Sequence, residues 1–185
     1  MVARSYLENA FNKANATVYE GGEHLPTFRM ATTLTAALVA GSNAYIAHVG
    51  DSRGYLIRSQ RIRQITRDHT WTAENVSKGI LSPEEAEAHP LRNTLTRAIG
   101  MSDSLQVDTF REPLLDNDKL LLCTDGLYTL LSDQEILDVT QSHEPQPACD
   151  ELAAIAESRG GEDDTTVVIA RLVCMTSESP RIAGF

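Results

Sequence analysis

The segment Leu120–Asp133, LLLCTDGLYTLLSD, combines an apolar run with an acidic residue near its end. Residues 120–123 form a continuous apolar run, which predicts a strand buried on both faces. Asp125 follows this run, and Gly126 then predicts a sharp turn of the backbone. A carboxylate at the tip of a core strand is costly unless a cation or a hydrogen-bond donor meets it. The segment therefore predicts a central strand that ends in a candidate cation ligand.

The composition is that of one acidic globular domain. The chain has 185 residues, 42% of them hydrophobic, which is enough to bury a sizeable core. We expect a single domain over residues 1–174, followed by a loose tail over residues 175–185. The formal net charge of −10 argues against a nucleic-acid partner or an anionic membrane, since both select basic faces. A phosphorylated substrate would also be repelled unless bound cations reverse the local field.

The cysteines and the first residues favour a cytoplasmic protein. Cys123, Cys149 and Cys174 are odd in number and widely spaced, which favours free thiols over a disulfide framework or structural zinc. The N-terminus lacks the apolar core of a signal peptide, and no apolar run approaches the ~20 residues of a membrane span. We therefore expect a cytoplasmic location and no membrane partner.

The spacing of apolar residues predicts a mixture of helices and strands. A helix is expected over residues 2–19, ended by Gly21 and Gly22. Short turn signals between the next four strands predict an antiparallel meander. A capping-box pattern at Ser132 predicts the start of a later helix. The expected strands are 33–40, 44–49, 55–58, 61–65, 94–99, 107–111, 119–123 and 165–172, and a last helix is expected over 148–159.

Residues 68–93 form a long polar insertion between two predicted strands. The insertion contains one helix signal, with Ser82 as the N-cap, Glu85 to close a capping box and Pro90 to end the helix. An insertion of this length is typical of a functional flap.

Three acidic positions share the same place relative to a predicted strand. Asp51 and Asp125 each follow a strand, and the acidic run 162–164 precedes one. Carboxylates that converge on one rim of a sheet repel one another unless a cation neutralises them. An oxygen-only ligand set favours Mg²⁺ or Mn²⁺ over zinc. The alternative is that each acid serves only as a turn or cap residue.

Ser52 lies in a second pattern, because residues 50–54 match the G-x-S-x-G nucleophile elbow of serine hydrolases. That elbow needs a strand, a sharp turn and then a helix, whereas residues 55–58 predict another strand. The five histidines show no metal-binding spacing. His48 is expected to be a packed or rim residue, and His69, at the start of the flap, is a candidate for a role beside the substrate.

Six blocks in register resemble the metal-dependent protein phosphatase 2C family in its compact bacterial form. The resemblance covers about residues 1–172, and it implies an α+β fold: a β-sandwich of two antiparallel sheets flanked by helices. It also implies hydrolysis of phosphoserine and phosphothreonine in proteins, with paired Mn²⁺ or Mg²⁺ ions that activate a water. The blocks are Met30–Leu34 (with Ala31 where the family usually has Gly), Ala47–Arg53, Arg67–His69, Pro90–Gly100, Leu122–Leu127 and Asp163–Thr166.

By position, the resemblance assigns ligands to particular acids. Asp125 and Asp163 look like direct ligands of the metal centre, and Asp51 looks like a ligand of a third, more weakly held metal that Asp125 also touches. The chain departs from the family at two places near that third metal, with Asp164 where Asn is usual and Thr129 where an acid is often found. The segment 70–93 corresponds to the family's flap, which influences the choice of substrate.

The largest departure from the family is at the front of the chain. The family begins with strands that carry a phosphate-contacting Arg and with acidic blocks that supply a metal-bridging Asp, and no such blocks precede the first helix here. The resemblance thus implies sheets without their N-terminal strands, whose exposed edges invite pairing with a second copy or a partner chain. The leading hypothesis is a metal-dependent phosphatase. The alternatives are a pseudophosphatase that binds a phosphoprotein or is completed by a partner, and a serine hydrolase that uses Ser52.

Overall fold

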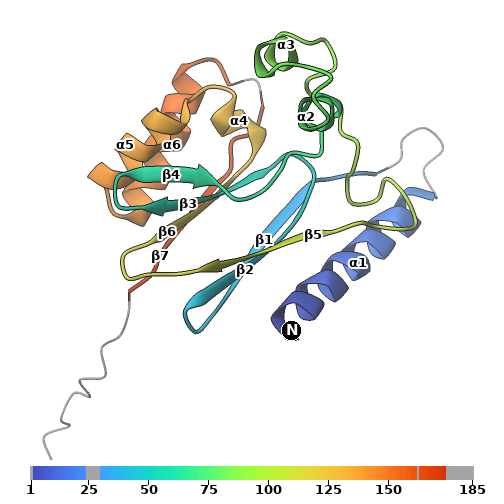
Figure 1. Cartoon of the computed structure of the whole chain (residues 1–185), viewed down its shortest axis with the longest axis horizontal. Helices are drawn as coiled ribbons and strands as arrows, with labels where there is room; N and C mark the ends of the chain where they lie inside the picture. The colour runs from blue at the N-terminus through green and yellow to red at the C-terminus, as the bar shows by residue number, and fades with distance from the viewer. Residues whose placement is uncertain (1, 24–29, 162, 174–185) are drawn as a thin grey trace, which may run out of the picture.

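The computed structural model describes residues 2–23, 30–161 and 163–173, and Figure 1 shows their arrangement. Two antiparallel sheets form the centre of the molecule. The first has the order β1-β2-β5 and the second β4-β3-β6-β7. The strands are β1 (Leu34–Ala40), β2 (Asn43–Val49), β3 (Arg53–Arg58), β4 (Arg61–Gln64), β5 (Asp108–Pro113), β6 (Lys119–Cys123) and β7 (Val167–Arg171). The helices are α1 (Val2–Glu23), α2 (Trp71–Ser77), α3 (Pro83–Glu87), α4 (Asp125–Tyr128), α5 (Asp133–Ser142) and α6 (Pro145–Ser158).

The two sheets pack face to face, and helices cover their outer faces. Alternate residues of a strand point to opposite faces, so each central strand contributes to two cores. On β2, Ile46 enters the core between the sheets, while Ala47 and Val49 face α1. On β3, Leu56 enters the same central core, while Tyr55 faces α5 and α6. The result is an α+β sandwich with the layers helix, sheet, sheet and helix, as the sequence predicted (Figure 1).

The predicted strand at residues 119–123 is confirmed in full as β6, at the centre of the four-stranded sheet. Its register places Leu121 opposite both Tyr55 of β3 and Ile169 of β7. Capping boxes at Ser82 and Ser132 are also confirmed, since each serine accepts a hydrogen bond from the amide three residues later. The signals that depend on local backbone chemistry therefore gave correct helix starts.

Several predictions about element boundaries were wrong. Helix α1 continues through Gly21 and Gly22 to Glu23, because a helical glycine costs only about 1 kcal/mol and α1 is held by its buried face. The expected meander is instead two hairpins, β1–β2 and β3–β4, that belong to different sheets. Residues 94–99 form no strand and make only the isolated bridges Thr32–Ile99 and Thr70–Leu95. These bridges hold the start of the flap at Thr70 and the segment before β1 at Thr32, and they do not extend a sheet.

The helical content around the predicted flap and the last helix is also larger than expected. The insertion holds α2 in addition to the predicted α3, with Thr70 as its N-cap. Helix α6 begins at Pro145, three residues before the predicted start at 148, because Pro145 occupies the first helical turn. Cys123 is buried and Cys149 half-buried, both as free thiols, as predicted. Cys174 and the expected tail over 175–185 lie outside the described residues.

Within the residues that the structure describes, no helix combines the length and the hydropathy needed to cross a bilayer.

Candidate functional site

The three predicted acids line one open cleft at the end of the sandwich. Asp51, Asp125 and Asp163 lie along its wall, together with residues of the segment that joins α2 and α3 to the sheets. The cleft has a volume of about 1390 Å³, large enough for a segment of peptide rather than a small molecule alone. Helices α2, α3 and α4 all lie at this end of the two sheets (Figure 1). The structure therefore brings together the acids that the sequence placed far apart.

Asp51 lies in the short connection by which the chain leaves one sheet and enters the other. Gly50 precedes it with φ of 111°, a backbone conformation that side chains rarely adopt, and a Cβ there would lie 2.4 Å from Thr33 Cγ2. The Tyr128 hydroxyl donates to the carbonyl of Asp51 at 3.0 Å. The Ser52 and Thr33 hydroxyls lie 2.8 Å apart and form a hydrogen bond. The backbone on both sides of Asp51 is thus fixed by buried or half-buried partners.

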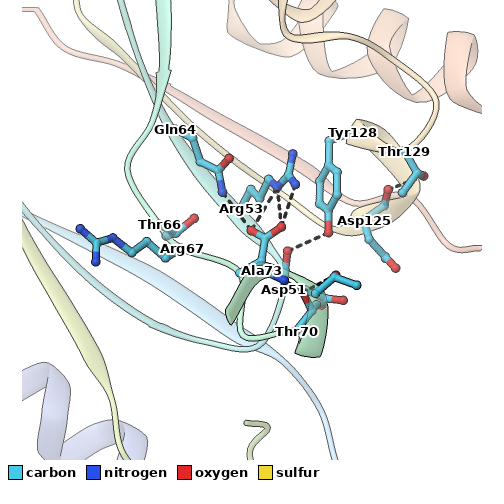
Figure 2. Close-up of polar contacts among 12 residues, drawn as sticks. Asp51, Arg53, Gln64, Thr66, Arg67, Thr70, Ala73, Asp125, Tyr128 and Thr129 are labelled. Carbon is cyan, nitrogen blue, oxygen red and sulfur yellow. Dashed lines mark hydrogen bonds and ion pairs between the residues drawn. The ribbon is translucent and has the colours of Figure 1, made fainter. Parts of the chain in front are cut away.

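The electrostatics of Asp51 reflect its acidic neighbour. Burial and the nearby Asp125 carboxylate raise the pKa of Asp51 to about 6. A carboxylate whose ionisation is opposed by burial and by a neighbouring acid is one that a divalent cation would stabilise. Figure 2 shows Asp51 below and to the left of the Tyr128 hydroxyl and Asp125 to its right.

A partly buried ion pair that sequence reasoning missed supports this loop. Arg53 donates to both oxygens of Asp68 at 2.7–3.1 Å, and Gln64 donates to Asp68 at 2.9 Å. The Arg53 guanidinium also lies over the Tyr128 ring, 3.5 Å from its centroid (Figure 2). The sequence blocks that contain Arg53 and Asp68 were identified. That these two residues form an ion pair could not be predicted, because 15 positions separate them in the chain.

Asp125 occupies the first turn of α4, a four-residue helix that begins just after β6. This corrects the sequence prediction, since the chain enters a helix at Asp125 and Gly126 lies within that helix instead of in a sharp turn. Thr124 connects this helix to the acidic run near β7, because its hydroxyl donates to the Asp164 carbonyl and accepts from the Thr166 amide. A Cβ at Gly126 would lie 3.2 Å from the Asp163 carbonyl. The missing side chain of Gly126 therefore lets the Asp125 and Asp163 backbones approach closely.

The donor chemistry of the cleft suits a hard divalent cation only in part. Its acids provide oxygen ligands, as Mg²⁺ and Mn²⁺ prefer. In the described part of the chain, however, no three His, Cys, Asp or Glu side chains gather closely enough to hold a metal ion as a group. The Thr129 hydroxyl is committed to the Asp125 carbonyl at 2.7 Å. A metal here would need water, substrate oxygens or further ligands to complete its shell.

The serine-hydrolase elbow is not formed. Ser52 is only 8% exposed, its hydroxyl bonds Thr33, and strand β3 follows it where the elbow needs a helix. His48 is fully buried, in agreement with the packed role expected for it. His69 is only 2% exposed, yet it belongs to the lining of the cleft, so a role beside the substrate stays a prediction.

Comparison with known proteins agrees with this geometry. A family model described as Protein phosphatase 2C matches residues 4–78, and one described as Stage II sporulation protein E matches residues 65–173. The serine/threonine phosphatase stp of Listeria welshimeri is 43% identical over 141 residues, which is 76% of this chain and 56% of that protein. The crystal structure of the Mycobacterium tuberculosis serine/threonine phosphatase PstP/Ppp superposes with a TM-score of 0.86 at 36% identity, covering 92% of this chain and 72% of that one.

A further structure, the catalytic domain of the serine/threonine protein phosphatase PstP in complex with two manganese ions, matches with a TM-score of 0.82 at 34% identity. It covers 92% of this chain and 71% of that one. The chain belongs to the protein phosphatase 2C family. It spans a little over half the length of the Listeria relative.

Proposed function

We propose that this chain is a metal-dependent phosphatase that acts on phosphoserine and phosphothreonine in proteins. The observation that carries the proposal is the convergence of Asp51, Asp125 and Asp163 on one cleft, with a raised pKa at Asp51. The stp and PstP relatives, named as serine/threonine phosphatases, support the same reaction. Phosphomonoester hydrolysis transfers the phosphoryl group to water, so that the P–O bond to the serine or threonine breaks and its hydroxyl is released.

The residues of this chain would hold Mn²⁺ or Mg²⁺ through carboxylate oxygens. Asp125 and Asp163 are the proposed ligands of the metal centre, and Asp51 is the proposed ligand of a further ion shared with Asp125. A bound pair of ions in such a site lowers the pKa of a coordinated water and stabilises the charge on phosphate oxygens. No arginine is needed for that purpose, and the Arg67 guanidinium points away from Asp51 and Asp125 (Figure 2).

The cleft also supports a phosphorylated protein as the substrate. Residues of α2 and α3 line the cleft together with the acids, so the segment 70–93 is the proposed flap over a peptide. A peptide substrate fits the volume of the cleft better than a small metabolite does. We keep the cytoplasm as the proposed location, where phosphorylated proteins and free thiols coexist.

The test is hydrolysis of a phosphothreonine peptide with and without Mn²⁺. We expect Mn²⁺-dependent release of phosphate that Asp125→Ala lowers at least 100-fold, because both proposed sites lose a ligand. Asp138→Ala on α5 is the matched control, since it removes the same charge from an exposed position outside the cleft. Ser52→Ala is expected to retain activity. An unchanged rate in Asp125→Ala would contradict the proposed site.

A second function is favoured by the incomplete ligand set. Because no close group of three metal-binding side chains occurs in the described residues, the chain would bind phosphoproteins as a pseudophosphatase or obtain ligands from a partner. The sheet edges offer places for such a partner, since β1 and β7 each pair on one side only and expose Val39 and Val168. Sedimentation and Mn²⁺ titration of the isolated chain separate the two functions. Tight Mn²⁺ binding and turnover by a monomer would exclude the second.

A further inference from the structure

His69 contacts the backbone of the Asp51 loop at two points. Its amide donates to the Gly50 carbonyl at 2.7 Å, and its Nδ1 accepts from the Gly50 amide at 3.1 Å. Both polar groups of Gly50 are thus bound by one residue, although 19 positions separate them in the chain. Gly50 itself has φ of 111° and directly precedes Asp51. Because His69 hydrogen-bonds both the amide and the carbonyl of Gly50, it fixes the direction in which the backbone continues to Asp51.

The far side of the imidazole is fixed by charged groups from β5 and from the segment before it. Nδ1 accepts a hydrogen bond, so the ring proton lies on Nε2. Nε2 lies 3.3 Å from a carboxylate oxygen of Asp108 but makes no hydrogen bond to it. Asp108 is held in turn by Arg97 at 2.8 Å. Burial and the Arg97 charge lower the pKa of His69, which favours the neutral ring that this arrangement needs.

We propose that His69 is a positioning residue for Asp51: it holds Gly50 so that the Asp51 carboxylate faces Asp125 across the cleft. The inference rests on the proposed function in taking Asp51 as a metal ligand. It assigns His69 neither contact with substrate nor a ligand role, because its Nδ1 is occupied and its side chain is buried. Groups that orient metal ligands usually contribute 10–100-fold in metal affinity, so the effect is measurable.

His48 provides a matched control. Its ring lies 4.7 Å from the His69 ring and is equally buried, but its nitrogens bond Thr35 and the Arg67 carbonyl instead of Gly50. His48→Leu and His69→Leu therefore remove similar buried rings from the same pair, and only the second leaves the Gly50 amide without its acceptor. His69→Asn is the conservative variant. The asparagine Oδ1 can accept a hydrogen bond from the Gly50 amide in place of Nδ1, and the asparagine side chain has no equivalent of Nε2.

The first measurement needs no metal. Hydrogen exchange of the Gly50 amide, followed by NMR, is expected to be slow in the native chain and in His69→Asn, and at least tenfold faster in His69→Leu than in His48→Leu. The native amide is also expected to show a scalar coupling across the hydrogen bond to His69 Nδ1. If Gly50 exchanges equally slowly in the two leucine variants, the proposal is overturned, whatever the metal does.

The second measurement is Mn²⁺ affinity by electron paramagnetic resonance, with Asp51→Asn as the reference for loss of the weaker site. We expect His69→Leu to weaken Mn²⁺ binding at that site about tenfold or more, and His69→Asn to recover most of the loss. His48→Leu is expected to retain the native affinity within about twofold. If Asp51→Asn binds Mn²⁺ like the native chain, the ligand assignment of the proposed function fails. Equal losses in the two leucine variants would overturn the positioning role alone.

Discussion

The two acidic turns of the cleft are built in different ways. The Asp51 loop has buried or half-buried side-chain partners, with His69 on Gly50, Tyr128 on the Asp51 carbonyl and Thr33 on Ser52. The turn that carries Asp163 is exposed, and its contacts run through backbone carbonyls to Thr124 and to the space left by Gly126. One carboxylate is therefore held in advance by side chains, whereas the other is held mainly by the path of the backbone.

This difference indicates where repulsion between carboxylates destabilises the metal-free protein. The Asp51 loop keeps a carboxylate of raised pKa near another acid, so its network must oppose their repulsion. The Asp163 turn is exposed to solvent, where water screens interactions between charges. We expect substitutions in the first region to change stability strongly and substitutions in the second to act on metal binding. The predictions below test this contrast, from the largest effect to the smallest.

Gly50→Ala is expected to be the most damaging change, with a loss of about 4 kcal/mol in the free energy of unfolding. The new Cβ would lie 2.4 Å from Thr33 Cγ2, and the alanine would have to adopt the positive φ of 111° that the native backbone has at this position. Gly41→Ala is the control, because Gly41 has a positive φ but no atom within 4 Å of its Cβ position. The control is expected to cost about 1–2 kcal/mol. Urea denaturation measures both, and equal losses would show that crowding at Thr33 contributes nothing.

Asp68→Ala is expected to cost about 2 kcal/mol, because it leaves the partly buried Arg53 guanidinium beside Tyr128 without its carboxylate. The matched comparison is Glu112→Ala, which breaks an ion pair to the largely exposed Arg63 and is expected to cost less than about 1 kcal/mol. Thermal unfolding at constant pH gives the two values. A small loss in Asp68→Ala would mean that the network around Asp51 is not what stabilises its loop.

Asp51→Asn is expected to stabilise the metal-free chain near pH 7. Asp51 has a pKa of about 6 in the folded chain, above its model-compound value of 3.8, so ionisation opposes folding. The fold is therefore destabilised progressively as pH rises from about 4 to 6. The asparagine variant avoids this loss, with a gain of about 1–2 kcal/mol at pH 7 that disappears below pH 4.

Unfolding curves measured from pH 3.5 to pH 7.5 test this pH dependence, and Mn²⁺ adds a second arm. Bound Mn²⁺ is expected to stabilise the native chain at pH 7, so that its free energy of unfolding exceeds that of Asp51→Asn. A variant whose advantage is the same at pH 4 and at pH 7 would contradict a raised pKa at Asp51.

The sequence predicted which acids line the cleft better than it predicted the contacts that hold them. Asp51, Asp125 and the run 162–164 were candidates because each lies beside a strand with a strong apolar pattern, and the family resemblance then singled out Asp163. Strand β6 was predicted from its apolar run, and the capping boxes were predicted from a serine and a glutamate three residues apart. Both signals are local in the chain. The sequence therefore identified the candidate ligands and one wall of the cleft.

The contacts that hold the cleft residues in place join residues that are far apart in the chain. Nothing local to Arg53 shows that it meets Asp68, and nothing local to His69 shows that it binds Gly50. Residues 94–99 have strand-like composition, but no neighbouring strand is available, so only two bridges form. The division of four strands between two sheets likewise depends on the conformation of Gly50, which a sequence pattern indicates only as a turn.

Gly126→Ala is expected to have the smallest effect on stability and a clear effect on metal binding. Alanine favours helix α4 by about 1 kcal/mol, but its Cβ would lie 2.8 Å from Thr165 Oγ1 and 3.2 Å from the Asp163 carbonyl. The two effects offset each other, so the free energy of unfolding is expected to change by less than about 1 kcal/mol. The Asp163 turn, which has few side-chain partners, moves to relieve the contact, and Mn²⁺ affinity falls.

Gly21→Ala in α1 provides the comparison, because it adds the same helix preference with only an ordinary 3.9 Å contact to Met30 Sδ. It is expected to stabilise the chain by about 1 kcal/mol and to leave Mn²⁺ binding unchanged. Unfolding and Mn²⁺ titration on the same samples separate the two quantities. If Gly126→Ala loses several kcal/mol while it retains Mn²⁺ affinity, the Asp163 turn is as rigidly supported as the Asp51 loop. The contrast between the two regions would then be wrong.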